Sequence, residues 1–207
     1  MIDGAQGYSE DVIFYKGRFY AVTKRGALAI CDVTGESPVV TIITTPPLRR
    51  PLPSRTRLVD YDRYYSDELL YLVDAFGELL LVARYFELVV DTEPNMSVYK
   101  TVGFDVFRSD PNSRWLIWKR VYTLGDCMLF LGGNSSFCLL ATDFARCEKN
   151  CIYFTDYNYK VKGNGRRLIH DSGVFNLEDG SIDPLPYCDA SSEFFPSSPI
   201  WILTNPC

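Results

Sequence analysis

The sequence predicts an all-β protein, built as a partial β-propeller of about three four-stranded antiparallel blades with little helix. Three observations lead to this prediction. Short apolar runs alternate with turn residues along the chain, which is typical of strands. Two similar phrases, "FYAVTKRGALAI" and "LYLVDAFGELLL", recur about fifty residues apart, so that Gly26 overlays Gly77. No stretch shows the sustained apolar period of 3.6 residues that an amphipathic helix needs.

The three blades are expected within a single domain, 1–207, at roughly 11–45, 68–123 and 127–204. The first would contain the runs "VIFY", "RFYAVT", "ALAICDV" and "VVTIIT". The second would contain "ELLYLVD", "ELLLVARYF", "GFDVFRSD" and "RWLIWKRV", and the third "CMLFLGG", "CIYFTD", "GVFNLED" and a poorly defined last strand. Glycine in the connectors suits tight hairpins, which often need a residue with positive φ.

Two segments are predicted to be loops, 44–67 and 157–172. The first contains "TTPPLRRPLPSRTR", whose prolines cannot pair within a central strand. The second contains "KVKGNGRRLIHDS", which is basic and rich in glycine. Both are expected to leave one face of the sheets.

Charge and composition narrow the classes of partner. The net charge is −5 and 47% of the residues are hydrophobic, so neither nucleic acid nor an anionic membrane is an expected partner. No apolar run approaches the roughly 20 residues that span a bilayer. The N-terminus does not resemble a secretory signal. We therefore expect a cytoplasmic and/or nuclear protein with reduced cysteines.

The residues that could carry chemistry favour structural interpretations. His170 is the single histidine, and Asp171 could orient it, but no nucleophile elbow accompanies the pair. Cys147 and Cys151 form a C-x3-C pair that departs from the usual zinc spacing. The remaining ligands in range would be Cys138, His170 and Cys188. The sequence therefore assigns no catalytic, cofactor-binding or metal-binding residue, and no cofactor is expected.

Four further sequence features could suggest a function, but each also has a simpler structural explanation. "GNGRR" (163–167) lacks the pattern of a phosphate loop, and "RRPLPSR" (49–55) resembles a proline-rich ligand but equally suits a stiff solvated linker. A carboxylate cluster precedes the second blade, and a glycosidase would need two such groups facing each other. Trp115 and Trp118 should point to opposite faces of a strand, one of them into the core. The clustered carboxylates are Asp60, Asp62, Asp67 and Glu68.

An ordered set of phrases carries a resemblance to a known family. The phrases are "DVIFYKGRFYAV", "YLVDAFGELLLVAR", "LGDCMLFLGGNSS", "NCIYFTD", "GVFNLEDGSI" and "PIWILTNP". In this order they resemble the C-terminal KIB-type β-propeller of plant F-box proteins, also catalogued as domain of unknown function 295. The resemblance runs from about Tyr8 to Pro206.

The resemblance implies a non-enzymatic module that binds a protein substrate for an SCF-type ubiquitin ligase. In that family a separate helical F-box binds the ligase adaptor, and no segment here resembles it. We therefore expect this truncated chain not to bind the adaptor. Two alternatives remain, a propeller-scaffold enzyme acting on glycans and a truncated product without independent function. An isolated chain is expected to be poorly stable, with blade faces such as those of "ELLLVARYF" and "CIYF" meeting water.

Overall fold

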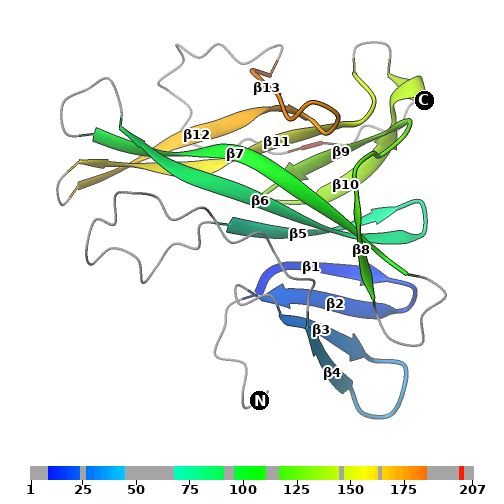
Figure 1. The fold of residues 1–207 in the computed structure, drawn as a ribbon. Coiled ribbons are helices and arrows are strands. Elements are labelled where there is room, and N and C mark those ends of the chain that lie inside the picture. Colours follow the sequence, from blue (N-terminus) through cyan, green and yellow to red (C-terminus); the bar gives the residue numbers. More distant parts are fainter. Residues whose placement is uncertain are drawn as a thin grey trace. The chain divides into compact units, whose positions relative to one another are not determined.

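In the computed structural model most of the described residues form β-strands (Figure 1). The fold is an all-β partial propeller, as predicted, and helix within the described residues is limited to the 3-10 turn Ala141–Asp143. No helix in this part of the chain is long and apolar enough to cross a membrane. The described residues are 9–23, 27–44, 68–90, 96–110, 117–144, 147–162, 165–185 and 201–202.

The chain packs as two compact units. Unit 1 combines Met1–Tyr85 with Phe104–Val121, and unit 2 combines Phe86–Gly103 with Tyr122–Cys207. The prediction that residues 1–207 form a single domain is not tested by this division and stays a prediction.

The first blade is a regular antiparallel meander in unit 1. Its strands pair in the order β1-β2-β3-β4 (Figure 1), which agrees with the four runs expected over 11–45. Lys16 and Gly17 join the first two strands with φ of 44° and 81°. Positive φ at both turn positions gives the hairpin a twist that matches its strands. The strands are β1 (Ser9–Tyr15), β2 (Arg18–Thr23), β3 (Ala27–Asp32) and β4 (Val39–Thr44).

The second group of strands also follows chain order. Strands β5 (Glu68–Ala75), β6 (Glu78–Val90) and β7 (Met96–Ser109) are neighbours, and β8 (Trp118–Val121) pairs with β7. Phe76 and Gly77 make the β5–β6 turn with φ of 53° and 85°. This geometry matches the turn at Gly17. The turn at Gly77 therefore corresponds to the turn at Gly17, which precedes the first repeated phrase, and Gly26 lies outside the described residues.

The third group differs from the prediction in one strand and one pairing. A strand over Ser136–Leu140 was not expected, and it turns back along Cys127–Gly132. The next strand then lies on the other side of Cys127–Gly132 and runs parallel to it. These strands pair in the order β10 (Ser136–Leu140), β9 (Cys127–Gly132), β11 (Cys151–Lys162), β12 (Gly165–Asn176) and β13 (Ile182–Asp183). The end of β11 also pairs with β7, so they belong to the same sheet as β5 to β8. The extra strand reverses the direction of the chain once more, so β11 runs parallel to its neighbour β9. The prediction that every strand pair of this blade is antiparallel was therefore wrong.

The predicted loop over 157–172 was wrong, because β11 and β12 continue through it as one hairpin. The backbone pairs run from Cys151 with Asn176 to Lys162 with Gly165. Polar and apolar residues alternate in "YNYKVK", and a paired ribbon satisfies its backbone groups without a continuous apolar run. The other predicted loop, 44–67, lies outside the described residues except for Thr44, the last residue of β4.

The core of unit 1 forms between the first blade and β5–β6. Two hydrogen bonds hold β1 in place: Tyr15 Oη donates to the Gly77 carbonyl at 2.6 Å, and the Leu72 N–H donates to Asp11 Oδ2 at 2.8 Å. Burial of these apolar side chains supplies the main stabilisation. The buried members are Tyr15, Tyr20, Val22, Leu28, Leu70, Leu72, Leu79, Leu81, Ala83, Tyr85 and Phe107.

Asp11 gives the first testable expectation. Burial raises the pKa of its carboxyl above the ordinary value of 3.8, against the backbone N–H donors of Leu72 and Val12. Asp11→Ala is expected to cost about 1 kcal/mol of unfolding free energy, because the Leu72 N–H loses its acceptor. Asp11→Asn keeps an acceptor oxygen and removes the buried charge, so it should stay within about 0.5 kcal/mol of the unaltered protein at neutral pH.

Urea unfolding of both variants across pH checks this expectation. A raised folded-state pKa means that the fold favours the protonated carboxyl, so stability rises as the pH falls through that pKa. The free energy of unfolding of the asparagine variant should therefore fall below that of the unaltered protein as the pH falls toward 3.8. Equal losses for alanine and asparagine at every pH would show that the Leu72 hydrogen bond is not what Asp11 contributes.

Polar side chains inside unit 1 connect β5, β6, β7 and β8. Tyr85 Oη donates to Asp105 Oδ2 at 3.0 Å, and the guanidinium of Arg120 pairs with the other oxygen of Asp105. Arg84 is fully buried, and its Nη1 donates to Tyr71 Oη at 3.2 Å. Buried polar groups need such partners to offset their desolvation. The Asp105 carboxylate therefore has structural partners from two neighbouring strands.

Unit 2 has a smaller core around β9 and β11. Met128, Cys151 and Tyr153 are buried there. The Tyr153 ring stacks on Phe130 with centroids 4.9 Å apart, and Trp201 meets the same ring edge-on at 5.0 Å. Trp201 Nε1 also donates to the Leu131 carbonyl at 2.8 Å. The segment that contains Trp201 is thus held on β9.

Candidate interaction surface

One face of the first blade is apolar and open. Side chains of directly paired residues lie on the same face of a sheet, and the register pairs Phe14 with Phe19, Val12 with Ala21, and Ala29 with Ile42. We call this surface the outer face. It consists of Val12, Phe14, Phe19, Ala21, Ala29, Cys31, Val40 and Ile42.

The opposite face of the same sheet packs into the core of unit 1. It carries Tyr15, Tyr20, Val22, Leu28 and Ile30. Both faces therefore carry mainly aliphatic and aromatic side chains, although only the opposite face packs in the core of unit 1. An antiparallel sheet with one wet face normally alternates apolar and polar residues, so the composition of the outer face is that of a buried surface.

The exposure of the largest side chains shows how open the outer face is. Phe14 is 59% exposed, Ile42 58% and Val12 52%. The rings of Phe14 and Phe19 contact each other with centroids 5.0 Å apart, so they form one raised aromatic pair. Contiguous apolar surface of this kind marks contact sites on soluble proteins.

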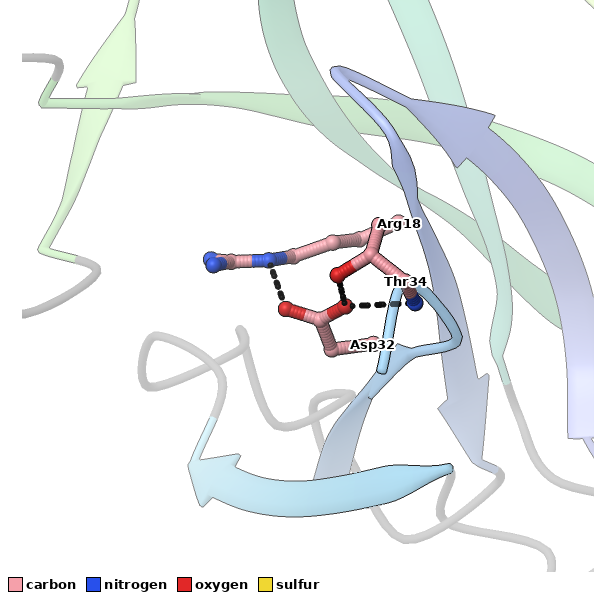
Figure 2. A network of polar contacts seen from close by, with 3 residues as sticks. All are labelled: Arg18, Asp32 and Thr34. Carbon is pink, nitrogen blue, oxygen red and sulfur yellow. Dashed lines mark hydrogen bonds and ion pairs between the residues drawn. The ribbon is translucent and has the colours of Figure 1, made fainter. Parts of the chain in front are cut away.

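A polar network secures the end of β3 on the other face of the same blade. Figure 2 shows Asp32 between Arg18 and Thr34. Arg18 Nε donates to Asp32 Oδ2 at 2.9 Å, and the N–H and hydroxyl of Thr34 donate to Asp32 Oδ1 at 3.0 and 2.6 Å. Hydrogen bonds from Thr34 and the charge of Arg18 hold the pKa of Asp32 below its ordinary value. The network shapes the turn after β3, since an Asp that accepts from the second following N–H makes an Asx turn.

The outer face suits binding rather than catalysis. Apart from Cys31, its members have no ionisable side chain and offer no nucleophile, acid or base. An interface core is depleted of charge and enriched in aromatic residues in the same way. The geometry therefore favours contact with an apolar macromolecular surface.

The Asp171 carboxylate joins two strands of unit 2. Its Oδ2 accepts hydrogen bonds from the N–H and the hydroxyl of Thr101, at 3.1 and 2.6 Å. This joins β12 to β7 within unit 2. His170 lies on β12 with its backbone paired to Tyr157. The side chain of His170 is not among the described ones, so its orientation by Asp171 stays a prediction.

The two cysteines of the C-x3-C pair are free thiols in unit 2. Cys151 is buried at the start of β11, and Cys147 packs against the same core. Burial raises the pKa of the Cys151 thiol to about 11, with further contributions from the carboxylates of Glu148, Asp179 and Asp183. A thiol of such high pKa is a poor metal ligand and nucleophile. Among the described residues, no group of three or more histidine, cysteine or acidic side chains could hold a metal ion.

The other residues named from the sequence lie either in described strands or outside the described part of the chain. Trp118 packs against the core of unit 1, which confirms the interpretation of one tryptophan as a core residue. Glu68 begins β5, and Cys138 is buried in β10. Outside the described residues lie Trp115, Cys188, Asp60, Asp62, Asp67 and 49–55, together with Gly163 and Asn164 of "GNGRR".

Sequence reasoning placed the exposed apolar faces in the wrong strands. Leu79 to Tyr85 of "ELLLVARYF" are buried, and so are Cys151 to Phe154 of "CIYF". The open face belongs instead to the first blade. A signal was present, because "VIFY" and "FYAV" are apolar at every position and "VVTII" is apolar at all but Thr41. Such continuous runs indicate strands that are meant to be covered on both sides.

Comparison with known proteins agrees with this architecture. The family model described as KIB1-4 beta-propeller matches residues 1–176. The chain belongs to this family. The resemblance inferred from the ordered phrases is thereby confirmed.

Curated relatives of this KIB1-4 propeller chain include F-box proteins of Arabidopsis thaliana. The putative F-box protein At3g25750 is 32% identical over 83% of this chain and 40% of its own length. The F-box protein SKIP23 is 26% identical over 95% of this chain and 46% of its own length. The chain thus spans less than half the length of these relatives. No solved structure matches it significantly.

Proposed function

We propose that this chain is a non-enzymatic protein-interaction module, equivalent to part of the substrate-recognition propeller of an F-box receptor for an SCF-type ubiquitin ligase. The observation that carries the proposal is the outer face, an uncharged apolar surface on a member of a family whose relatives are named F-box proteins. The outer face is its contact surface.

The carboxylates support a structural role over a catalytic one. Asp11, Asp105 and Asp171 each accept hydrogen bonds that join one strand to another. A glycan-active enzyme would instead need an acid and a base directed at a substrate. The proposal therefore assigns this chain binding without chemistry.

A direct binding experiment tests the proposed function. Proteins labelled by proximity to residues 1–207 in plant cells are purified and titrated against the purified chain. We expect at least one to bind at a defined stoichiometry and to lose most of its affinity when Phe14 and Ile42 are both replaced by serine. Phe76→Ser is the matched control, because Phe76 is 63% exposed on the β5–β6 turn. If no labelled protein binds directly, the proposal is wrong.

Adaptor binding and location complete the proposal. Residues 1–207 alone are expected not to bind the SCF adaptor, because nothing in their sequence resembles the amphipathic helices of an F-box. A pull-down with purified adaptor checks this, and capture equal to that by a full-length relative would contradict it. The proposed site of action is the cytoplasm and/or the nucleus, which a fluorescent fusion would reveal.

A further inference from the structure

We propose that the far end of the β11–β12 ribbon binds an extended acidic segment of a partner protein, through cations on one face of the ribbon. The inference rests on the proposed function only in taking the chain to bind proteins. It goes further by naming a second contact surface, which lies in unit 2, and the chemistry of the segment that this surface recognises.

Positive charge is concentrated in this ribbon. Between Asp156 and Asp171 the sequence reads "YNYKVKGNGRRLIH", which contains four lysine or arginine residues and no carboxylate. The whole chain carries a net charge of −5, so this stretch is opposite in sign to the protein as a whole. A local excess of charge of this kind attracts a partner of the opposite sign and orients its approach.

The backbone register places three of these cations on one face of the ribbon. Lys160 is paired directly with Arg167, and Lys162 lies two residues further along β11, where it is paired with Gly165. Residues that are directly paired, and residues two apart along a strand, lie on the same face of a sheet. We call Lys160, Lys162 and Arg167 the basic face. The fourth cation, Arg166, is at an alternate position and belongs to the other side.

The neighbouring strand adds no carboxylate at the positions that pair with this end of β11. Val98 of β7 is opposite Lys160, and Met96 is opposite Lys162. The two cross-strand rows of the basic face therefore contain only cations and uncharged residues. Lys160 and Arg167 repel each other across the ribbon, since like charges directly opposite destabilise a strand pair. An anion bound between them removes that repulsion.

The spacing of the cations fits an extended peptide. A strand rises about 3.3 Å per residue, so the backbone positions of Lys160 and Lys162 are about 7 Å apart along β11. An extended partner segment repeats at the same distance, because every second side chain is on the same side. Carboxylates at alternate positions of that segment would meet both lysines, with Arg167 beside the first. Lysine and arginine form strong charge-assisted hydrogen bonds with carboxylates.

The same face limits the length of the ligand. Asp156 and Asp171 are paired with each other on this face, four residues before Lys160, which is about 13 Å along the strand. Their carboxylates repel a polyanion that continues along the ribbon, such as a nucleic acid with its regularly spaced phosphates. A short acidic protein segment ends before it reaches them. The geometry therefore favours a peptide over a nucleic acid.

Fluorescence anisotropy of a labelled synthetic peptide tests the proposal on the full chain. In the peptide glutamate alternates with serine, and the control peptide has glutamine in place of every glutamate. We expect saturable binding of the acidic peptide only. Its affinity should fall as the salt concentration is raised from about 0.05 to about 0.5 M, because salt screens contacts between charges.

Matched variants show whether the basic face is responsible. The double variant Lys160→Gln with Arg167→Gln should bind the acidic peptide about tenfold more weakly, because the charge pairs are lost. Arg108→Gln with Lys149→Gln is the control, since these cations lie in surface ion pairs elsewhere. Each double variant removes two positive charges, so a difference between them reports the position of the charges and not the net charge.

Hydrogen exchange separates the loss of binding from the loss of the ribbon. Lys160→Glu places a negative charge opposite Arg167, so it should slow exchange in β11 and β12 while it abolishes binding of the acidic peptide. Bound peptide should also slow exchange in these strands of the unaltered chain, because a ligand of the folded form stabilises that form.

Four results would overturn the inference. They are the absence of saturable binding that salt weakens, equal affinities of the two double variants, tighter binding of a single-stranded oligonucleotide of equal charge, and loss of binding by Lys160→Glu with faster exchange. The last would make the ribbon itself responsible, and not its charge. These measurements use purified components, so their failure leaves the outer face and its partners in cells unaffected, and the failure of that search leaves the basic face standing.

Discussion

Replacing Leu81 by alanine is expected to lower the free energy of unfolding by about 2–5 kcal/mol. Leu81 lies on β6, is fully buried and is paired with Leu72 across the β5–β6 hairpin. It belongs to the core in which Tyr20 and Leu28 of the first blade are also buried. The loss includes the transfer free energy of the missing carbons and the cost of the cavity that remains, because a packed sheet core collapses only in part.

Urea unfolding at a fixed protein concentration measures this loss. Leu81→Met keeps the volume and should cost less than about 1.5 kcal/mol. Phe76→Ala removes a larger side chain from an exposed turn of the same unit and should change stability by no more than about 0.5 kcal/mol. If all three variants unfold at the same urea concentration, unit 1 does not have the core described here.

Gly173→Ala is expected to destabilise unit 2 by about 1–3 kcal/mol, because the site has no room for a methyl group. Gly173 is paired with Phe154 on β11. An added Cβ would lie 2.8 Å from the Asp183 carbonyl oxygen and 2.9 Å from Cζ of Phe154. The carbonyl belongs to the backbone of β13, so relief requires either this strand or the buried ring to move.

Hydrogen exchange followed by mass spectrometry is the suitable measurement, since it reports on the strands of unit 2 separately. We expect faster exchange in β11, β12 and β13 of the variant. Gly103→Ala is the matched control: Gly103 lies on β7 in the same unit, and an added Cβ there meets nothing within 4 Å. Equal exchange in both variants would mean that Gly173 is not tightly packed.

The sequence was most informative where apolar runs are short and turns are marked. The four runs of the first blade and the four of the second became strands β1 to β8 in the expected order. The reason is local, because strand-forming residues between glycine turns restrict the backbone before any tertiary contact forms. Ordered phrases along the chain also sufficed to recognise the family, which the match over residues 1–176 confirmed.

The errors arose where pairing partners decide the structure. The ribbon of β11 and β12 extends through a stretch that reads as a basic loop, since its backbone hydrogen bonds come from pairing with each other. The strand Ser136–Leu140 is short and pairs antiparallel with β9. Because it reverses the direction of the chain, the next strand, β11, runs parallel to β9. A strand can pair with several others in several registers, and amino-acid composition does not show which of these pairings is the most stable.

The sequence by itself determined that this protein is built from β-strands, that its strands are apolar on both sides in the first blade, and that it belongs among KIB-type propellers. Tertiary structure alone decided which apolar face is covered. Leu79 to Tyr85 became core and Phe14, Phe19 and Ile42 became surface, although both sets have the composition of buried strands. Burial depends on which sheet is available to pack against, and that is a property of the assembled fold.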